Sequence, residues 1–479
     1  MMRHLLAAAL LAWTSVASAQ LPPVVSQMMA ASNIPDDAIG VLVLRGETTL
    51  VSHMAERPMQ PASTMKLVTT LVGLEQLGPV FKGRTELRSA GTLTGDVLKG
   101  DLVLRGGADM DLSGEVLTNM LQALRNQGVR RIEGNLILDR QLFNPARSDV
   151  GQPPFDESPD AYYNVIPDAL LVNKNMLLLD MRSTRSQVVV NSQPVLDRLS
   201  VESNFTLIDA PCARWEDGWK QPQVTRAPDG TMKVLLKGTF PKNCVAWNSI
   251  NVVDRQDYVD RLVRETWRRL GGSISGETIE GATPADARLL TEHVSRSLPE
   301  LVRDINKPSD NALARTVYLS LGSLEADAVI GSHPMPGAGP TALRADLVVR
   351  DWMRRHGIDD AGMVIENGSG LSRIEKITPR QMGLLLNAGL RSKWAPEFLA
   401  SLPIVGVDGT MRRRLKDSPA AERARMKTGT LRNVTAVAGY VPDASGQPCV
   451  VVAMINTERA TEAKGRAVLD ALVDWVATH

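Results

Sequence analysis

The chain of 479 residues is longer than a single hydrophobic core usually supports, which predicts roughly two to four domains. Hydrophobic residues make up 43% and charged residues 22% of it, a composition typical of a globular protein and not of a disordered one. The formal net charge of +1 gives no electrostatic reason to expect nucleic acid or an acidic membrane surface as a partner.

The N-terminus, residues 1–19, is predicted to be a secretory signal peptide. An apolar run from Leu5 to Val16 is followed by Ala17-Ser18-Ala19, a small-x-small cleavage site. As a helix this run would extend only about 18 Å, which is shorter than the hydrocarbon core of a membrane. We therefore expect cleavage near Gln20, no stable membrane anchor, and a periplasmic mature protein.

The first elements after this segment are a helix and a hairpin. We expect the helix at 22–31 and the hairpin strands at 40–45 and 48–54, joined by a turn at Gly46-Glu47. Ser63 is expected to open a second helix, because apolar residues recur after it at helical spacing: Leu67, Val68, Leu71, Leu74 and Leu77. Gly78-Pro79 ends that helix.

From residue 81 to 277 the sequence changes to short β-like runs separated by turn residues. The predicted strands are 97–105, 131–139, 176–180, 187–191 and 232–236, with one helix at 114–127. We interpret 81–277 as inserted α+β and β-rich material that forms two nested domains, an inner one at about 96–165 and an outer one from its flanks.

Helical patterns return towards the C-terminus, followed by three consecutive strands. The predicted helices are 256–269, 299–306, 311–322 and 461–479, and the strands are 426–430, 434–441 and 448–456. The N-terminal hairpin is expected to complete this antiparallel sheet. The predicted fold class is therefore α/β (α+β), an antiparallel sheet with covering helices, in a discontinuous catalytic domain of residues 20–80 and 278–479.

Three short motifs follow one another along the chain: Ser63-Thr64-Met65-Lys66, Ser309-Asp310-Asn311 and Lys427-Thr428-Gly429-Thr430. Each one alone is a weak signal, since S-x-x-K is expected about once by chance in a chain of this length and Ser-Asp-Asn is an ordinary helix cap. In this order they resemble the motif set of penicillin-binding proteins and β-lactamases, in which the first serine is the nucleophile.

Ser63 and Lys66 stand at positions i and i+3 near a helix start, so the lysine amine can reach the serine hydroxyl. A serine hydroxyl needs a base, and lysine serves as one only when burial or a nearby cation makes it neutral. The motif set implies that Lys427 is that cation. It also implies that the Ser309 hydroxyl bridges these groups and passes the proton to the leaving amine.

The same motifs imply how a substrate binds. Asn311 would donate to an amide carbonyl of the substrate, and Thr428 and Thr430 would bind its terminal carboxylate. Gly429 would let the substrate backbone approach, since a side chain there would block it. The backbone N–H groups of Ser63 and Thr430 would form an oxyanion hole.

The sequence contains no motif typical of a metal site, of another type of nucleophile or of a nucleotide-binding loop. The mature chain has five histidines, none of them in a metal-binding or nucleophile-elbow motif: His53, His293, His333, His356 and His479. No C-x-x-C, H-E-x-x-H, P-loop or G-x-G-x-x-G is found. We expect neither a metal nor an organic cofactor.

Essentially the whole mature chain resembles the D-alanyl-D-alanine carboxypeptidase/endopeptidase family, the class C low-molecular-mass penicillin-binding proteins of peptidase family S13. Four further segments carry the resemblance: Arg105–Asp109, Tyr163–Leu170 with Asn173 and Asn175 after it, Glu366–Arg373 and Gly406–Met411. Two positions depart from the family pattern, where Met110 replaces a proline and Asn367 replaces an aspartate. The second departure removes a charge and leaves the three motifs intact.

The resemblance implies a serine transpeptidase/β-lactamase-like domain with nested insertions, and a serine DD-peptidase. The enzyme would remove the terminal D-alanine of peptidoglycan stem peptides and cleave D-alanyl cross-links through an acyl-Ser63 intermediate. β-Lactam antibiotics would acylate Ser63 as covalent inhibitors. Asp156 and Arg373 would recognise the charged end of the stem peptide's diamino acid, although a turn aspartate and a structural arginine remain alternative interpretations.

Two other functions stay open as alternatives, a β-lactamase-like hydrolase or esterase and a non-catalytic cell-wall binding protein. The 246 residues from Ser63 to Ser309 exceed what a compact β-lactamase-like domain needs, and the intact motifs argue against a binding protein. Whether the cysteines form a disulfide is also left open. Cys212 and Cys244 could close a loop of about 30 residues or stay free, whereas Cys449 is expected to be a buried, unpaired residue.

Overall fold

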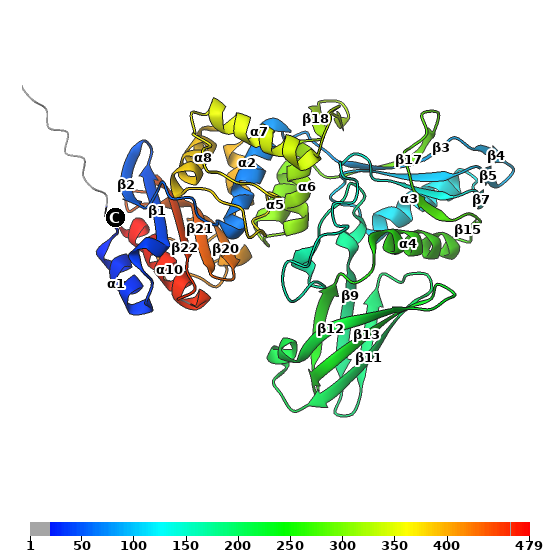
Figure 1. Ribbon diagram of the computed structural model, residues 1–479, viewed down its shortest axis with the longest axis horizontal. Coiled ribbons are helices and arrows are strands. Elements are labelled where there is room, and N and C mark those ends of the chain that lie inside the picture. Colours follow the sequence, from blue (N-terminus) through cyan, green and yellow to red (C-terminus); the bar gives the residue numbers. More distant parts are fainter. Residues whose placement is uncertain (1–19, 460) are drawn as a thin grey trace, which may run out of the picture.

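The computed structural model describes residues 20–459 and 461–479, so the predicted signal peptide lies outside the described part of the chain. Two regions are distinguished in Figure 1. One contains the N-terminal and C-terminal parts of the chain around a central sheet, and the other is built from the middle of the sequence. The site described below lies in the first region, on the side that faces the second.

The central sheet has five strands in the order β2-β1-β22-β21-β20. The strands are β1 (Ile39–Arg45), β2 (Thr48–His53), β20 (Arg425–Leu431), β21 (Val434–Pro442) and β22 (Pro448–Asn456). β1 pairs antiparallel with β22, with Ile39 opposite Ile455, which confirms the expected pairing of the N-terminal hairpin with the C-terminal strands. Most residues of β1, β21 and β22 are buried because helices cover both faces of the sheet.

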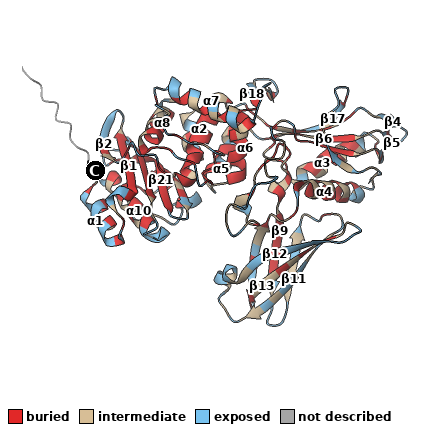
Figure 2. Ribbon diagram, viewed as in Figure 1, coloured by how far each residue is buried: buried red, intermediate tan, exposed pale blue. Residues whose placement is uncertain are grey.

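Alternate residues of the strands belong to two different cores. Val41 and Val43 pack with α1 (Pro23–Ser32) and α10 (Glu462–Thr478) on one face. Leu42 and Leu44 face the larger core on the other side, which Figure 2 shows as the most continuously buried part of the molecule. The helices of that core are α2 (Lys66–Gln76), α5 (Leu298–Asn306), α6 (Asn311–Leu321), α7 (Thr341–Arg355), α8 (Pro379–Arg391) and α9 (Ala395–Ser401).

The second region contains a five-stranded and a four-stranded sheet with two helices, α3 (Gly114–Asn126) and α4 (Arg255–Arg269). The five-stranded sheet consists of β16 (Thr278–Glu280), β8 (Leu136–Asp139), β6 (Leu102–Gly107), β3 (Arg84–Ser89) and β17 (Arg288–Val294). The other consists of β15 (Ser273–Ile274), β7 (Arg131–Glu133), β5 (Val97–Lys99) and β4 (Thr92–Thr94). These elements share one hydrophobic core with the strands of residues 177–250. This core is separate from the two cores on either face of the central sheet.

Two strands that the sequence predicted as continuous are each divided between these sheets. The run 97–105 is interrupted at Gly100, whose φ is 135°, and the run 131–139 is interrupted at Gly134. A Cβ at Gly134 would lie 2.4 Å from the backbone carbonyl of Gly100, so the two parallel segments pass side by side from one sheet into the other where neither has a side chain. Hydrophobic periodicity alone did not reveal this close approach.

Residues 177–250 add two three-stranded sheets. One consists of β10 (Val188–Gln193), β9 (Leu177–Ser183) and β14 (Val245–Ile250), and the other of β11 (Leu199–Ile208), β13 (Met232–Pro241) and β12 (Trp219–Arg226). A disulfide joins Cys212 to Cys244, with Cα atoms 5.2 Å apart, whereas Cys449 is buried and free. From this strand pairing we propose that the nested unit is 177–250 in place of 96–165, and that the inserted region extends to Val294 in place of 277.

Within the described residues, no helix is both long enough and sufficiently apolar to cross a membrane. A small hairpin, β18 (Leu324–Asp327) and β19 (Gly331–Pro334), completes the regular structure near the junction of the two regions.

Candidate active site

Ser63 lies in a short 3₁₀-helix (Ala62–Met65) that continues directly into α2. Lys66 is the first residue of α2, so its side chain lies on the same face as Ser63 one turn away. The Lys66 Nζ donates to Ser63 Oγ at 3.1 Å, to Asn311 Oδ1 at 2.6 Å and to the carbonyl of Ser369 at 2.5 Å. The predicted nucleophile and base are therefore in hydrogen-bonding contact, and the amine is held by three acceptors.

The charge state of Lys66 is set mainly by burial. Its side chain is fully buried, and desolvation lowers the pKa of its amine to about 7, assisted by the nearby Arg315 guanidinium and opposed by Asp310 and Glu375. The Arg315 guanidinium thus acts on Lys66 in the same direction as the cation that the sequence predicted at Lys427. A substantial fraction of Lys66 is neutral at physiological pH, which is the state that can accept a proton.

The second motif lies between α5 and α6. Ser309 adopts a left-handed backbone with φ of 68°, and Asp310 caps α6 by accepting from the backbone N–H of Leu313 at 2.9 Å. Asn311 starts the helix, and its side chain is fixed at both ends. Its Oδ1 accepts from Lys66, and its Nδ2 donates to the carbonyl of Tyr163 at 2.9 Å.

The third motif lies on β20, at the edge of the central sheet. Lys427 is fully buried, and its Nζ donates to Ser309 Oγ at 2.8 Å and to the carbonyl of Thr428 at 2.8 Å. Burial and the nearby Lys66 amine hold the pKa of Lys427 well below its usual range. A Cβ at Gly429 would lie 3.0 Å from the backbone nitrogen of Ser63, so β20 passes directly beside the nucleophile.

The two threonines of this motif lie towards the solvent side of β20. Thr428 is half-buried and donates from its hydroxyl to that of Thr410 at 2.8 Å. Thr430 is exposed, and its hydroxyl lies 3.5 Å from a carboxylate oxygen of Glu462. The structure thus brings all three motifs together around Ser63, although they are far apart in the sequence.

Several site residues were missed by sequence reasoning. Arg315 is almost completely buried and donates to the carbonyl of Val165 at 3.1 Å and to Ser369 Oγ at 3.3 Å. Its position, one helical turn after Asn311, was a usable signal. Glu375 is also buried, accepts three backbone N–H groups from residues 366–368 and has a raised pKa because of desolvation. It orders the loop that carries Ser369.

Asp156 and Arg373, which the resemblance assigned to substrate recognition, lie near one another at the rim of the site. The Asp156 carboxylate accepts from the Tyr163 hydroxyl at 2.9 Å and from Asn164 Nδ2 at 2.9 Å. The Arg373 guanidinium lies 4.4 Å from the centroid of the Phe155 ring, and its side chain is exposed. Both residues therefore border the same inserted loop, next to Tyr163, whose carbonyl holds Asn311.

The arrangement can perform acyl transfer at Ser63. It combines a hydroxyl nucleophile, a buried lysine with a lowered pKa, and a second serine whose hydroxyl accepts from the buried amine of Lys427. Among residues 20–459 and 461–479, no cluster of histidine, cysteine, aspartate and glutamate has the arrangement of a metal site.

Comparison with known proteins gives consistent matches. The sequence profile of the D-Ala-D-Ala carboxypeptidase 3 (S13) family matches residues 17–479. A D-alanyl-D-alanine carboxypeptidase of Actinomadura sp. (strain R39) is 30% identical over 422 residues, which cover 85% of this chain and 76% of that protein. These matches confirm the resemblance to peptidase family S13.

The fold is similar to that of penicillin binding protein 4 (dacB) from Haemophilus influenzae. Its crystal structure has a TM-score of 0.75 at 23% identity, covering 95% of this chain and 99% of that one. A crystal structure of the same protein complexed with a novel β-lactam has a TM-score of 0.71 at 23% identity, with coverage of 94% and 97%. This similarity confirms the predicted transpeptidase/β-lactamase-like fold class.

Proposed function

The chain belongs to the D-Ala-D-Ala carboxypeptidase 3 (S13) family of serine peptidases, and on this premise we propose that it hydrolyses both the D-Ala-D-Ala termini and the D-alanyl cross-links of peptidoglycan stem peptides. The observation that carries the proposal is the 3.1 Å contact between Lys66 Nζ and Ser63 Oγ, made by a fully buried amine with a pKa of about 7. That pair is equipped for attack on an acyl carbon.

In the first step, Lys66 accepts the proton of the Ser63 hydroxyl while Oγ attacks the carbonyl carbon of the penultimate D-alanine. The tetrahedral oxyanion is stabilised by the backbone N–H groups of Ser63 and Thr430. The proton then passes through Ser309 to the nitrogen of the leaving D-alanine, the C–N bond breaks, and an ester to Ser63 remains.

In the second step, water attacks the ester carbonyl and Lys66 accepts a proton from that water. The bond between the acyl carbon and Ser63 Oγ then breaks, and Lys66 returns the proton to Oγ, which leaves as the free hydroxyl. Asn311 supports both steps, because Nδ2 carries two hydrogens. One is held by the carbonyl of Tyr163, and the other is available for the amide carbonyl of the substrate. The hydroxyls of Thr428 and Thr430 would bind the terminal carboxylate.

β-Lactams would follow the first step and stop there, since their ring amide resembles the D-Ala-D-Ala bond. The predicted signal peptide supports action on peptidoglycan in the periplasm. A β-lactamase-like hydrolase is the second candidate function, because the same serine and lysine serve in that chemistry.

The proposal is tested by incubating the mature protein separately with a muropeptide ending in D-Ala-D-Ala, with a D-alanyl cross-linked muropeptide dimer, and with benzylpenicillin. We expect release of D-alanine from the first, monomers from the second, and slow, stoichiometric acylation by the third. Rapid, continuous consumption of benzylpenicillin without hydrolysis of either muropeptide would instead identify a β-lactamase.

The pH dependence of acylation follows from the state of Lys66. Only the neutral amine accepts the Ser63 proton, so the second-order rate constant for benzylpenicillin is expected to fall as pH decreases through about 7. Well below that pH the rate falls by about tenfold per unit. Stopped-flow or mass-spectrometric acylation rates from pH 5 to 9 check this, and a flat profile over that range would contradict it.

Asp156 and Arg373 are proposed to recognise the charged end of the stem peptide's diamino acid. Asp156→Asn is expected to reduce kcat/KM by about tenfold for a peptide with a free side-chain amine, because a charge-assisted hydrogen bond is lost. The same peptide with an acetylated amine should be affected far less. Asp209→Asn, at an exposed carboxylate of the nested unit, is the control, and an equal loss on both peptides would contradict the assignment.

A further inference from the structure

A turn of the inserted region extends to the Ser309-Asp310-Asn311 motif. Asn173, Lys174 and Asn175 follow one another in the left-handed region, with φ of 49°, 51° and 58°. Asparagine tolerates this conformation, whereas lysine seldom adopts it. Such a backbone persists only where the surrounding structure holds it. The fold therefore determines where the side chain of Lys174 lies.

Both asparagines fix the turn through side-chain hydrogen bonds. The Asn173 Oδ1 accepts from the backbone N–H of Gly114 at 2.8 Å, and its Nδ2 donates to the Tyr258 hydroxyl at 3.2 Å. The Asn175 Nδ2 donates to the carbonyl of Val253 at 2.7 Å. The backbone of Lys174 is thus held from α3, from α4 and from the segment that precedes α4.

The side chain that this turn presents pairs with the second catalytic motif. Lys174 Nζ lies 2.5 Å from Asp310 Oδ2, while Asp310 Oδ1 caps α6 at Leu313. The side chains of Lys174 and Asp310 are 43% and 17% exposed, so the pair is partly shielded from solvent. Arg296 lines the cavity beside this pair, but its guanidinium forms ion pairs with Asp111 and Asp304 and not with Asp310.

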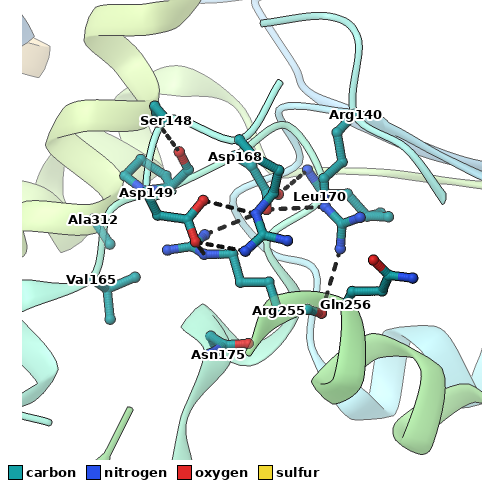
Figure 3. Close-up of polar contacts among 12 residues, drawn as sticks. Arg140, Ser148, Asp149, Val165, Asp168, Leu170, Asn175, Arg255, Gln256 and Ala312 are labelled. Atoms are coloured by element: carbon teal, nitrogen blue, oxygen red, sulfur yellow. Dashed lines mark hydrogen bonds and ion pairs between the residues drawn. The ribbon is translucent and has the colours of Figure 1, made fainter. Parts of the chain in front are cut away.

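The segment leading to the turn is held against α6 as well. The carbonyls of Tyr163 and Val165 accept from Asn311 and Arg315. Asp168 follows, and its buried Oδ2 lies 3.1 Å from Arg140 Nε and 3.5 Å from a guanidinium nitrogen of Arg255 (Figure 3). The contacts of Tyr163 and Val165 therefore join the inserted region to α6, and the ion pairs of Asp168 hold the following segment within the inserted region.

Asp310 also affects the base. Its carboxylate and that of Glu375 raise the pKa of Lys66, whereas burial and the Arg315 guanidinium lower it. Lys427 faces the site from β20, and its own pKa is lowered by burial and by Lys66. The positive charge of Lys174, which lies beside the Asp310 carboxylate, opposes the effect of that carboxylate on the pKa of Lys66 by Coulomb's law.

We propose that Lys174, contributed by the inserted region, is a positioning residue of the active site: it holds Asp310 at the start of α6 and balances its charge, so that Lys66 remains a base. The inference rests on the proposed function only in its use of Ser63 and Lys66 for acylation. It assigns to the insertion a part in the chemistry in addition to any role in substrate binding.

The test compares benzylpenicillin acylation by the wild type, Lys174→Met and Lys174→Arg between pH 5 and 9. In Lys174→Met we expect the acid limb of the profile to move up by roughly half a unit, which makes acylation at pH 6 about threefold slower. Lys174→Arg should restore the wild-type limb. Lys233→Met is the matched control, because Lys233 belongs to the same region, is 44% exposed and pairs with Glu202 at 2.5 Å.

A slower Lys174→Met whose limb does not move would show that the pair is merely structural, and an unchanged Lys174→Met would show that it has no role; either result overturns the proposal. Should Lys174→Met fail to fold, Asp310→Asn gives the opposite test, since asparagine keeps the helix cap. Its limb is expected to move down, and a limb that stays in place overturns the proposal.

Muropeptide hydrolysis tests the proposed function separately from these acylation profiles. A wild-type protein that is acylated by benzylpenicillin but releases no D-alanine from muropeptides would refute the peptidase assignment. The comparison of acylation profiles would remain valid in that case, because it requires only Ser63, Lys66 and the groups around them.

Discussion

Replacing Ser63 with alanine is expected to reduce peptide hydrolysis by at least about 10⁴-fold, since no covalent intermediate can form. The fold should survive the change. Lys66 loses one hydrogen-bond partner but keeps Asn311 Oδ1 at 2.6 Å and the carbonyl of Ser369 at 2.5 Å, so the buried amine is not left unpartnered. D-Alanine release from a muropeptide measures the activity, and thermal unfolding followed by circular dichroism measures the stability.

Ser186→Ala serves as the control for Ser63→Ala, because Ser186 is an exposed residue of the inserted region. It should retain full activity. A Ser63→Ala protein that melts like the wild type and still releases D-alanine at a comparable rate would exclude Ser63 as the nucleophile.

Replacing Lys66 with methionine is expected to slow acylation by about 10²- to 10⁴-fold, the usual contribution of a general base. Methionine has a similar length and suits the fully buried position, whereas Asn311 Oδ1 and the carbonyl of Ser369 lose their donor. We therefore expect a moderate loss of stability of roughly 1–3 kcal/mol together with the loss of rate. Stopped-flow acylation by benzylpenicillin and chemical denaturation measure the two effects.

The pH profile separates a missing base from a damaged fold. In Lys66→Met, the limb near pH 7 should disappear from whatever activity remains. Lys233→Met, the same substitution at a partly exposed ion pair, should keep both the rate and the limb. A Lys66→Met protein with the wild-type limb would show that another group accepts the serine proton.

The sequence predicted the catalytic region better than the inserted one. Its strands are long, apolar and separated by clear turns, so the pairing of the N-terminal hairpin with β22 could be expected. The inserted strands are short, and two of them change sheets at Gly100 and Gly134. The pattern of hydrophobic residues does not show where two paired strands pass together from one sheet into the next, so the division of these two runs could not be predicted.

The motif residues of the site could be predicted because their side chains perform the chemistry. The spacing of Arg315 from Asn311 gave a signal for its position but not for its effect on Lys66. Glu375 gave no signal, because its effect on the loop that carries Ser369 depends on burial and charge in the folded protein. The role of the Tyr163 carbonyl could not be predicted either, since a main-chain acceptor has no sequence signature. Lys174 is visible in the sequence only as a lysine between two asparagines, and its meaning depends on Asp310 lying beside it.

The disulfide is an intermediate case. The separation between Cys212 and Cys244 allowed either a bridge or two free thiols, and only their placement beside one another, with Cα atoms 5.2 Å apart, distinguishes these possibilities.

The central claim is that Ser63 becomes acylated, and intact-protein mass spectrometry of the mature protein with benzylpenicillin tests it most directly. The account predicts a stable adduct of one benzylpenicilloyl group on the wild type and none on Ser63→Ala. An adduct of equal yield on both proteins, or no adduct on either, would contradict it.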